Sequence, residues 1–396
     1  MAIVSQLFFT EKDLPFRWDQ IKNDFWSDLK SQTMNAVKSL IERFSEIEVQ
    51  DLVGGGRWRH LARRSTYRNG FYYRTLQTSL GFIPNLRLPR VRDGRRQPRL
   101  WKRYLRRSPD VDQAVLKVFL AGVSTRRVEE ALEPLLGEKA LSATTVSQIT
   151  KALDEQVARF HSQPIADDFA YLVFDGIYLH MKSPLQSKRR CILVAYGMKA
   201  NGQRQLLAFR LANHGESQIA WETFLNSLWR RGLWGSQLQL IVIDGNKGLA
   251  NAANLIYPHA KIQRCWAHKL RNAVNYVART DQSAFSAQTS LVYNAPSRSA
   301  ALDAFRELRH DWHRREPEAI ACLESDLESL LAFYSCPPQF WRRLRTTNAI
   351  ERIFREVRRR TRPMSTFNNL ASLERIIFAI FYRQNQRWLK SKKRKD

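Results

Sequence analysis

The chain has 396 residues, 44% of them apolar, so it is long enough for two or three domains with a core in each and is not a disordered polymer. Its formal net charge of +28 favours a polyanionic partner, above all nucleic acid, because Lys and Arg that neutralise phosphates release condensed counterions; a basic structural protein of the ribosomal type is the alternative. No long apolar run indicates a membrane segment, the N-terminus turns acidic too early for a signal peptide, and the four cysteines lack paired spacing, so we expect a cytoplasmic protein with no membrane contact.

The N-terminal region, residues 1–56, is predicted to be helical. Apolar side chains recur at spacings near 3.6 between residues 14 and 50, as on the packing face of a helix. No chemistry is visible in this stretch.

Residues 57–107 are predicted to form a basic β-ribbon. Asn69-Gly70 predicts a hairpin turn between arms rich in Tyr and Arg. Ten Arg or Lys and a single acid lie between residues 87 and 107, with Tyr and Trp among them. This pattern favours a ribbon that follows DNA phosphates, with Arg92 and Arg96 in contact with the backbone, over a solvated basic loop.

Residues 108–165 show three helical patterns, the second and third opening with the N-cap serines Ser124 and Ser142. This arrangement predicts a helix-turn-helix-like DNA-binding region. The third helix is expected to run on to about residue 160 and to present short polar groups suited to a major groove, namely Thr144, Thr145, Gln148 and Lys151. A small helical bundle that does not touch DNA is the alternative.

From residue 169 the pattern changes to strands. Three β patterns come first, the last two joined by Asn201-Gly202, which predicts a type I′ turn. A helix, a strand, a second helix and a further strand follow. This order predicts an α/β fold with an RNase H-like mixed sheet over residues 166–272. We expect an all-helical insertion over 273–340, and the second part of the core with a basic tail over 341–396.

Two carboxylates lie at matching places in this order of elements. Asp175 is on the first strand and Asp244 ends the fourth, so both are expected at one edge of the sheet, and the helix after the insertion carries Glu351. Taken singly, each could be a cap or a surface charge. Three converging carboxylates repel one another unless they share cations, and hard oxygen ligands suit Mg²⁺ or Mn²⁺. Such ions support phosphoryl transfer to water or to a 3′-hydroxyl.

Several stretches resemble the signature blocks of Mutator-type transposases of bacterial insertion sequences. They are FDGIYLHMK, VIDGNKGLANAA, IQRCWAHKLRN and TTNAIERIFREVRRRTRPMSTF, with YRNGFYYRTLQTSLG, LPRVRDG and GVSTRRVEEAL nearer the N-terminus. The resemblance covers most of residues 57–385. It implies an RNase H-like core with an Asp-Asp-Glu triad, here Asp175, Asp244 and Glu351. The chain would bind the terminal inverted repeats of its element, cut at the ends and join 3′-hydroxyls to target DNA, at least as a homodimer when two ends are held.

The same resemblance includes a Cys-x-x-His element, here Cys265 and His268. Two such residues are too few for a zinc site. We expect His268 to act with the catalytic carboxylates, by a hydrogen bond near the active edge or by contact with a phosphate, and Cys265 to be buried. A plain core role for both is the alternative.

The predicted helix that carries Glu351 also carries five arginines between residues 355 and 362. Helical spacing places Arg355, Arg358 and Arg362 on the side of Glu351, where guanidiniums can hold DNA phosphates. An ordinary i,i+4 ion pair between Arg355 and Glu351 is the alternative.

Overall fold

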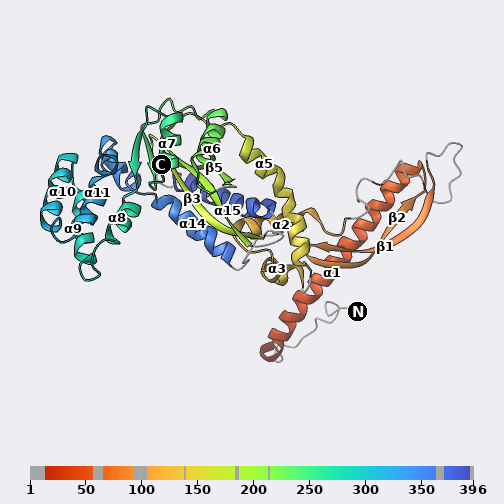
Figure 1. The fold of residues 1–396 in the computed structure, drawn as a ribbon. Coiled ribbons are helices and arrows are strands. Elements are labelled where there is room, and N and C mark those ends of the chain that lie inside the picture. Colours follow the sequence, from red (N-terminus) through yellow and green to blue (C-terminus); the bar gives the residue numbers. More distant parts are fainter. Residues whose placement is uncertain are drawn as a thin grey trace. The chain divides into compact units, whose positions relative to one another are not determined.

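The structure, a computed structural model, describes residues 14–56, 66–92, 98, 105–137, 140–182, 187–212, 215–362 and 370–392 (Figure 1). The chain divides into two compact units, the first made of Met1–Phe119 with Val123–Lys151 and the second of Leu120–Gly122 with Ala152–Asp396. Both contain helices, and the larger sheet lies in the second unit, so the predicted α/β class is confirmed. Among the described residues, no helix has the length and apolar character that a bilayer crossing requires.

The first unit begins with the predicted long helix, α1 (Leu14–Val53), which packs against a ribbon of two antiparallel strands, β1 (Arg68–Thr78) and β2 (Gly81–Val91). Alternate residues of the strands face the helix and bury their apolar side chains there. This cluster contains Leu76, Ile83, Leu86 and Leu88 of the ribbon with Met34, Val37 and Ile41 of α1.

The prediction of a hairpin turn at Asn69-Gly70 is wrong. Both residues lie inside β1, where the strand register shifts between Arg68 and Phe71, and Gly70 has a φ of +69°. The turn lies at residues 79–80 instead, closed by the Thr78–Gly81 pair. A glycine with positive φ serves a β-bulge as well as a turn, and the local sequence does not separate the two.

The described part of the first unit also contains α2 (Pro109–Ala121), α3 (Val128–Leu136) and α4 (Ala143–Thr150). Their apolar faces meet in one small core, which includes Val111, Val115, Val128, Leu132, Val146 and Ile149. The third predicted helix is shorter than expected. The chain passes through a 3₁₀ turn at Lys151–Leu153 into α5 (Asp154–Ser162), which belongs to the second unit. Asp154 at the start of α5 pairs with Arg375 at 2.6 Å, and this ion pair links α5 to the rest of the second unit.

The second unit is built on a five-stranded mixed sheet in the order β5-β4-β3-β6-β7. The strands are β3 (Phe169–Lys182), β4 (Ser187–Lys199), β5 (Arg204–Ala212), β6 (Leu240–Ile243) and β7 (Lys261–Arg264). The first three are antiparallel neighbours, and β6 and β7 run parallel to β3. The predicted order of strands and helices is confirmed.

The turn between β4 and β5 is not of type I′. Of its residues only Gly202 has positive φ, +80°, and the last backbone bond before the loop joins Lys199 N to Gln203 O at 2.9 Å. A three-residue loop with glycine at its left-handed position is the common alternative for the same Asn-Gly pair.

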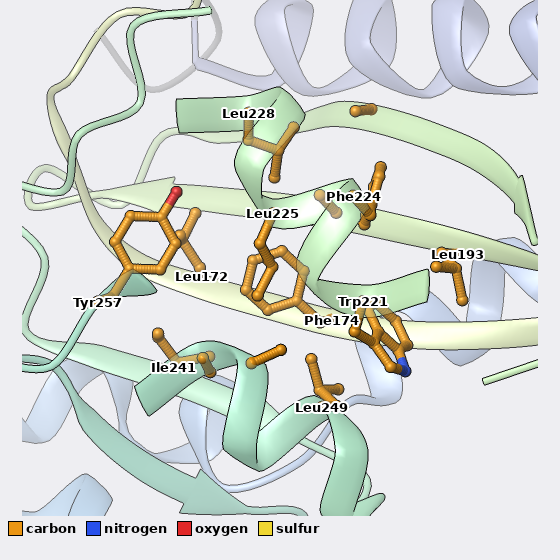
Figure 2. Packing of buried hydrophobic residues seen from close by; sticks show 14 of the residues in the cluster. Leu172, Phe174, Leu193, Trp221, Phe224, Leu225, Leu228, Ile241, Leu249 and Tyr257 are labelled. Atoms are coloured by element: carbon orange, nitrogen blue, oxygen red, sulfur yellow. The ribbon is translucent and has the colours of Figure 1, made fainter. Parts of the chain in front are cut away.

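One face of the sheet is covered by α6 (Gln218–Arg230) and α7 (Lys247–Ile256). Figure 2 shows the buried cluster between them and the strands, with Trp221, Phe224 and Leu228 of α6 over Phe174 and Leu193. The other side of β5 packs through Phe209 against the rings of Phe160 in α5 and Phe381 in α15 (Leu370–Lys392).

The segment between β7 and the final helices is helical, as predicted. It contains α8 (Trp266–Val274), α9 (Gln282–Asn294), α10 (Arg298–Trp312), α11 (Pro317–Glu324), α12 (Leu327–Leu330) and α13 (Pro338–Leu344), followed by α14 (Asn348–Thr361). Figure 1 shows α9, α10 and α11 gathered beside α8. Buried Gln263 of β7 donates to Leu330 O at 2.9 Å, which joins these helices to the sheet.

Candidate active site

Asp175 and Asp244 lie at the same level of two neighbouring parallel strands. Val173 of β3 is opposite Val242 of β6, and each aspartate follows two residues later in its chain. Asp175 is 6% exposed and accepts a hydrogen bond from Gly176 N at 2.8 Å. Asp244 accepts one from Asn246 N at 3.0 Å. Both carboxylates therefore lie at one edge of the sheet, as the strand order predicts.

The electrostatics of this edge are unfavourable for a second negative charge. Burial, together with the charges of Asp244 and Glu216, raises the pKa of Asp175 to about 7, and the charge of His268 opposes the rise. Two carboxylates in a poorly solvated place repel each other, so a cation bound between them would be strongly stabilised.

His268 lies on α8, next to this pair. Its helix starts directly after β7, where Cys265 N donates to Ile243 O at 2.8 Å. A hydrogen bond with Cys265, together with the charges of Cys265, Asp175 and Asp244, raises the pKa of His268 to about 9 against the effect of burial. Burial raises the pKa of the Cys265 thiol, but hydrogen bonds with His268 and Thr347 outweigh burial and hold this pKa below its ordinary value. Cys265 is buried, as expected.

Glu351 reaches the group from α14. Its Oε1 lies 3.5 Å from Nε2 of His268, and Thr347 Oγ1 lies 3.5 Å from Nδ1 of the same ring. Thr347 N in turn donates to Cys265 Sγ at 3.2 Å. The imidazole thus contacts Glu351 directly and interacts with the two aspartates through its charge, so the four residues that the sequence singles out lie in one region of the structure.

The donor set fits a hard divalent cation in its chemistry. Asp175, Asp244 and Glu351 offer only carboxylate oxygens, the ligands that Mg²⁺ and Mn²⁺ prefer. Within the described ranges, however, no three His, Cys, Asp or Glu side chains are close enough to hold one ion as they stand. The Glu351 carboxylate faces His268 instead.

Glu216 is a fourth carboxylate at this edge that the sequence analysis missed. It stands just before the Ser217 cap of α6, and its side chain lies over Gly176, where a Cβ would overlap the carboxylate. Burial raises the pKa of Glu216, and the charge of Asp244 adds to this. One signal was present in the sequence, the glycine directly after the buried aspartate. Nothing in the sequence indicated that its neighbour would be Glu216, 40 residues further on.

The five arginines between residues 355 and 362 divide into two sets. Arg355, Arg358 and Arg362 are exposed, as predicted. Arg359 and Arg360 pair with Glu356 at 2.8 and 3.0 Å. The alternative pairing of Arg355 with Glu351 is not the arrangement found, since Glu351 lies against His268.

The remaining predicted DNA contacts belong to the first unit. Thr144, Gln148 and Lys151 are exposed on or just after α4, whereas Thr145 is half-buried and its backbone N–H donates to the Ser142 cap at 3.1 Å. Lys151 begins the 3₁₀ turn rather than continuing the helix. Arg92 is exposed at the end of the ribbon, and Arg96 lies outside the described residues.

Comparison with known proteins agrees with the resemblance noted in the sequence. The family model described as "Transposase, Mutator family" matches residues 17–391. The chain is 32% identical to the transposase for insertion sequence element IS905 of Lactococcus lactis, over 92% of this chain and 90% of that protein. It is 31% identical to the transposase for ISRM5 of Rhizobium meliloti, over 90% and 88%. It is 28% identical to the transposase for IS256 in transposon Tn4001 of Staphylococcus aureus, over 91% and 92%. The chain therefore belongs to the Mutator family of transposases.

Proposed function

We propose that the chain binds the terminal inverted repeats of its own insertion sequence, cleaves DNA at the element ends and joins the 3′-hydroxyls to target DNA. One observation carries the proposal: Asp175 and Asp244 lie at the same level of adjacent parallel strands, and Glu351 lies against His268, whose pKa both aspartates raise. The fold and strand order that support them are those expected of an RNase H-like core.

The reaction needs no protein nucleophile. In cleavage, a water oxygen bonds to phosphorus and loses a proton while the bond from phosphorus to the 3′-oxygen breaks, and that oxygen takes up a proton. In joining, the freed 3′-hydroxyl attacks a target phosphate, loses its proton, and a target 3′-oxygen leaves. Asp175, Asp244 and Glu351 would hold Mg²⁺ or Mn²⁺, which supplies activation of the attacking oxygen and neutralises charge at the phosphate.

His268 contributes a positive charge to this edge. With a pKa raised to about 9 it is protonated at neutral pH, so it can face a phosphate while it orients Glu351. Outside the carboxylate edge, we assign Arg355, Arg358 and Arg362 to DNA phosphates because they are exposed on the helix that carries Glu351.

In the first unit, base reading is assigned to α4 through Thr144, Thr145, Gln148 and Lys151. Phosphate contact is assigned to the ribbon through Arg92 and Arg96. The open polar face of α4 over a small apolar core supports the first assignment. The pairs of Arg87 over Phe71 and Arg90 over Tyr72 show that guanidiniums line the ribbon.

A homodimer fits the need to hold two element ends. In support, α1 carries a second apolar stripe that the ribbon does not cover, with exposed Phe25, Leu29, Leu40, Phe44 and Ile47. These positions fall on one side of an α-helix.

A strand-transfer assay with terminal-repeat duplexes tests the function. We expect the native chain to nick the repeat end and to join it to a target duplex with Mg²⁺ or Mn²⁺, and Asp244→Asn to do neither while still binding DNA. Cleavage without joining would identify a nuclease. DNA binding without cleavage by the native chain would identify a DNA-binding regulator.

A further inference from the structure

The second unit contains a large cavity outside the carboxylate edge. Its volume is about 1280 Å³, and its walls come from β4, β5, α8, α13, α14 and α15 with part of α9. Pockets for small ligands usually measure about 300–1000 Å³. The size suits a segment of a polymer better than a metabolite.

The walls of this cavity are strongly basic. Nine arginines line it, and Glu356 is the one acidic side chain among the lining residues. That carboxylate is already held by Arg359 and Arg360. The lining therefore offers many more guanidinium donors than carboxylate acceptors, which suits the cavity to an anionic ligand rich in oxygen atoms.

Aromatic rings alternate with these guanidiniums. Arg204 lies 5.1 Å from the ring centre of Trp388, and Arg345 lies 5.0 Å from that of Tyr293. Proteins bind unpaired nucleic acid bases with such a mixture, since bases stack on aromatic and guanidinium planes while phosphates pair with Arg. The faces of paired bases are hidden inside a duplex, so this chemistry selects single strands.

The cavity adjoins the candidate active site through two helices. Trp266 lines it from α8, the helix of His268, and Arg352 lines it from α14, directly after Glu351. Arg352 and Arg359 project roughly a quarter-turn away from the row of Arg355, Arg358 and Arg362. The cavity is therefore lined by a set of α14 arginines distinct from that row.

We infer that this cavity binds a single-stranded segment of DNA next to the phosphate that is cut. The choice of DNA as the polyanion rests on the proposed function. The arginines would hold the phosphates, and the aromatic rings would stack with bases that have left the duplex. The unpaired strand would thereby be kept from re-annealing beside the carboxylates.

The first experiment measures binding of a fluorescent single-stranded oligonucleotide of about 12 nucleotides by anisotropy, in the full chain carrying Asp244→Asn so that nothing is cut. The test pair is Arg343→Ala with Arg387→Ala, because both residues line the cavity and are exposed. The matched control is Arg279→Ala with Arg314→Ala, which removes the same charge from exposed positions away from the cavity.

We expect the cavity pair to weaken single-strand binding about tenfold or more, and the control pair by less than about threefold. Binding of a terminal-repeat duplex should change equally little in both pairs. Equal losses of single-strand affinity in the two pairs, or a loss confined to the duplex, would overturn the inference.

A second experiment needs no cavity variant. An oligonucleotide with 5-iododeoxyuridine, bound to the Asp244→Asn chain and irradiated, should crosslink to aromatic residues, and we expect the adducts at Tyr293 or Trp388. Adducts confined to the ribbon, such as at Tyr73, would refute the assignment. If the native chain shows no strand transfer although these adducts form, the proposed function fails and the single-strand site stands.

Discussion

At the scale of single residues, the unusual feature is the buried carboxylate of Asp175. Its folded-state pKa of about 7 lies above its ordinary value of 3.8. Between these two pH values the folded state binds a proton that the unfolded chain does not. The stabilisation from this proton is complete below about pH 4 and is lost as pH rises to about 7. His268, raised from 6.5 to about 9, acts in the same direction over a more alkaline range.

The first prediction is that Asp175→Asn stabilises the metal-free chain. At about pH 8 with a chelator, we expect the free energy of unfolding to rise by about 1–2 kcal/mol, because the buried charge and its repulsion with Asp244 are removed. Thermal unfolding measures the change. Excess Mg²⁺ should stabilise the native chain and not the variant. Asp303→Asn, an exposed aspartate paired with Arg306, is the control and should show no gain. A less stable Asp175→Asn chain under these conditions would contradict the assignment.

The second prediction concerns the contact between Gly176 and Glu216. A Cβ at Gly176 would overlap the Glu216 carboxylate, so Gly176→Ala must displace one of them. We expect strand cleavage to fall about tenfold or more with binding of repeat DNA little changed. In a double-mutant cycle, Glu216→Ala should relieve much of the added loss of stability, measured by denaturant unfolding. Additive effects of the two substitutions would show that the contact is not the cause.

At the scale of elements, α14 carries Glu351, the proposed third metal ligand, together with exposed cations. The third prediction is that Arg355→Ala and Arg358→Ala weaken binding to all DNA sequences alike. Each substitution should flatten the slope of log affinity against log salt by about 1, because one phosphate contact is lost. Titrations at several salt concentrations measure this, with Arg306→Ala as the exposed control. An unchanged slope in both variants would remove α14 from the DNA interface.

The helix α4 gives the fourth prediction. Gln148→Ala should reduce discrimination between terminal-repeat and scrambled duplexes by about 1–3 kcal/mol, the worth of a bidentate base contact. Arg92→Ala should instead lower affinity for both duplexes. Competition binding distinguishes the two outcomes. If Gln148→Ala leaves the preference for the repeat intact, base reading must be sought outside this face.

Elements with strong periodicity could be predicted from the sequence, and features set by distant contacts could not. The spacing of apolar residues predicts α1 and the order of strands around Asp175 and Asp244. Both Asn-Gly pairs were predicted to form tight hairpin turns, but one lies in a bulge of β1 and the other in a three-residue loop after β4. A glycine with positive φ occurs in all of these local structures. The break at Lys151–Leu153 separates two units, and the pairing of Asp154 with Arg375 is invisible to local patterns. The place of Glu216 beside Gly176 could not be predicted for the same reason, since it depends on a contact between distant parts of the chain.

At the scale of the whole molecule, α1 shows two apolar stripes on one helix. Met34, Val37 and Ile41 pack on the ribbon, whereas the stripe from Phe25 to Ile47 is exposed. Exposure of these large apolar side chains to water is energetically unfavourable. Pairing of two α1 helices along this stripe would bury it and would bring together two chains, each with its own carboxylate edge.

The last prediction tests this pairing. Leu40→Ser with Phe44→Ser removes two neighbouring exposed side chains of the stripe, 53% and 57% exposed, without touching the ribbon cluster. We expect sedimentation to show a dimer for the native chain and a shift to monomer, with at least about a tenfold higher dissociation constant, for the variant. Asn35→Ser, an exposed change on the opposite side of α1, is the control. Because joining requires two held ends, the variant should also lose concerted joining of paired ends while it still nicks a single repeat. A native chain that stays monomeric with repeat DNA bound would rule out α1 as the dimer contact.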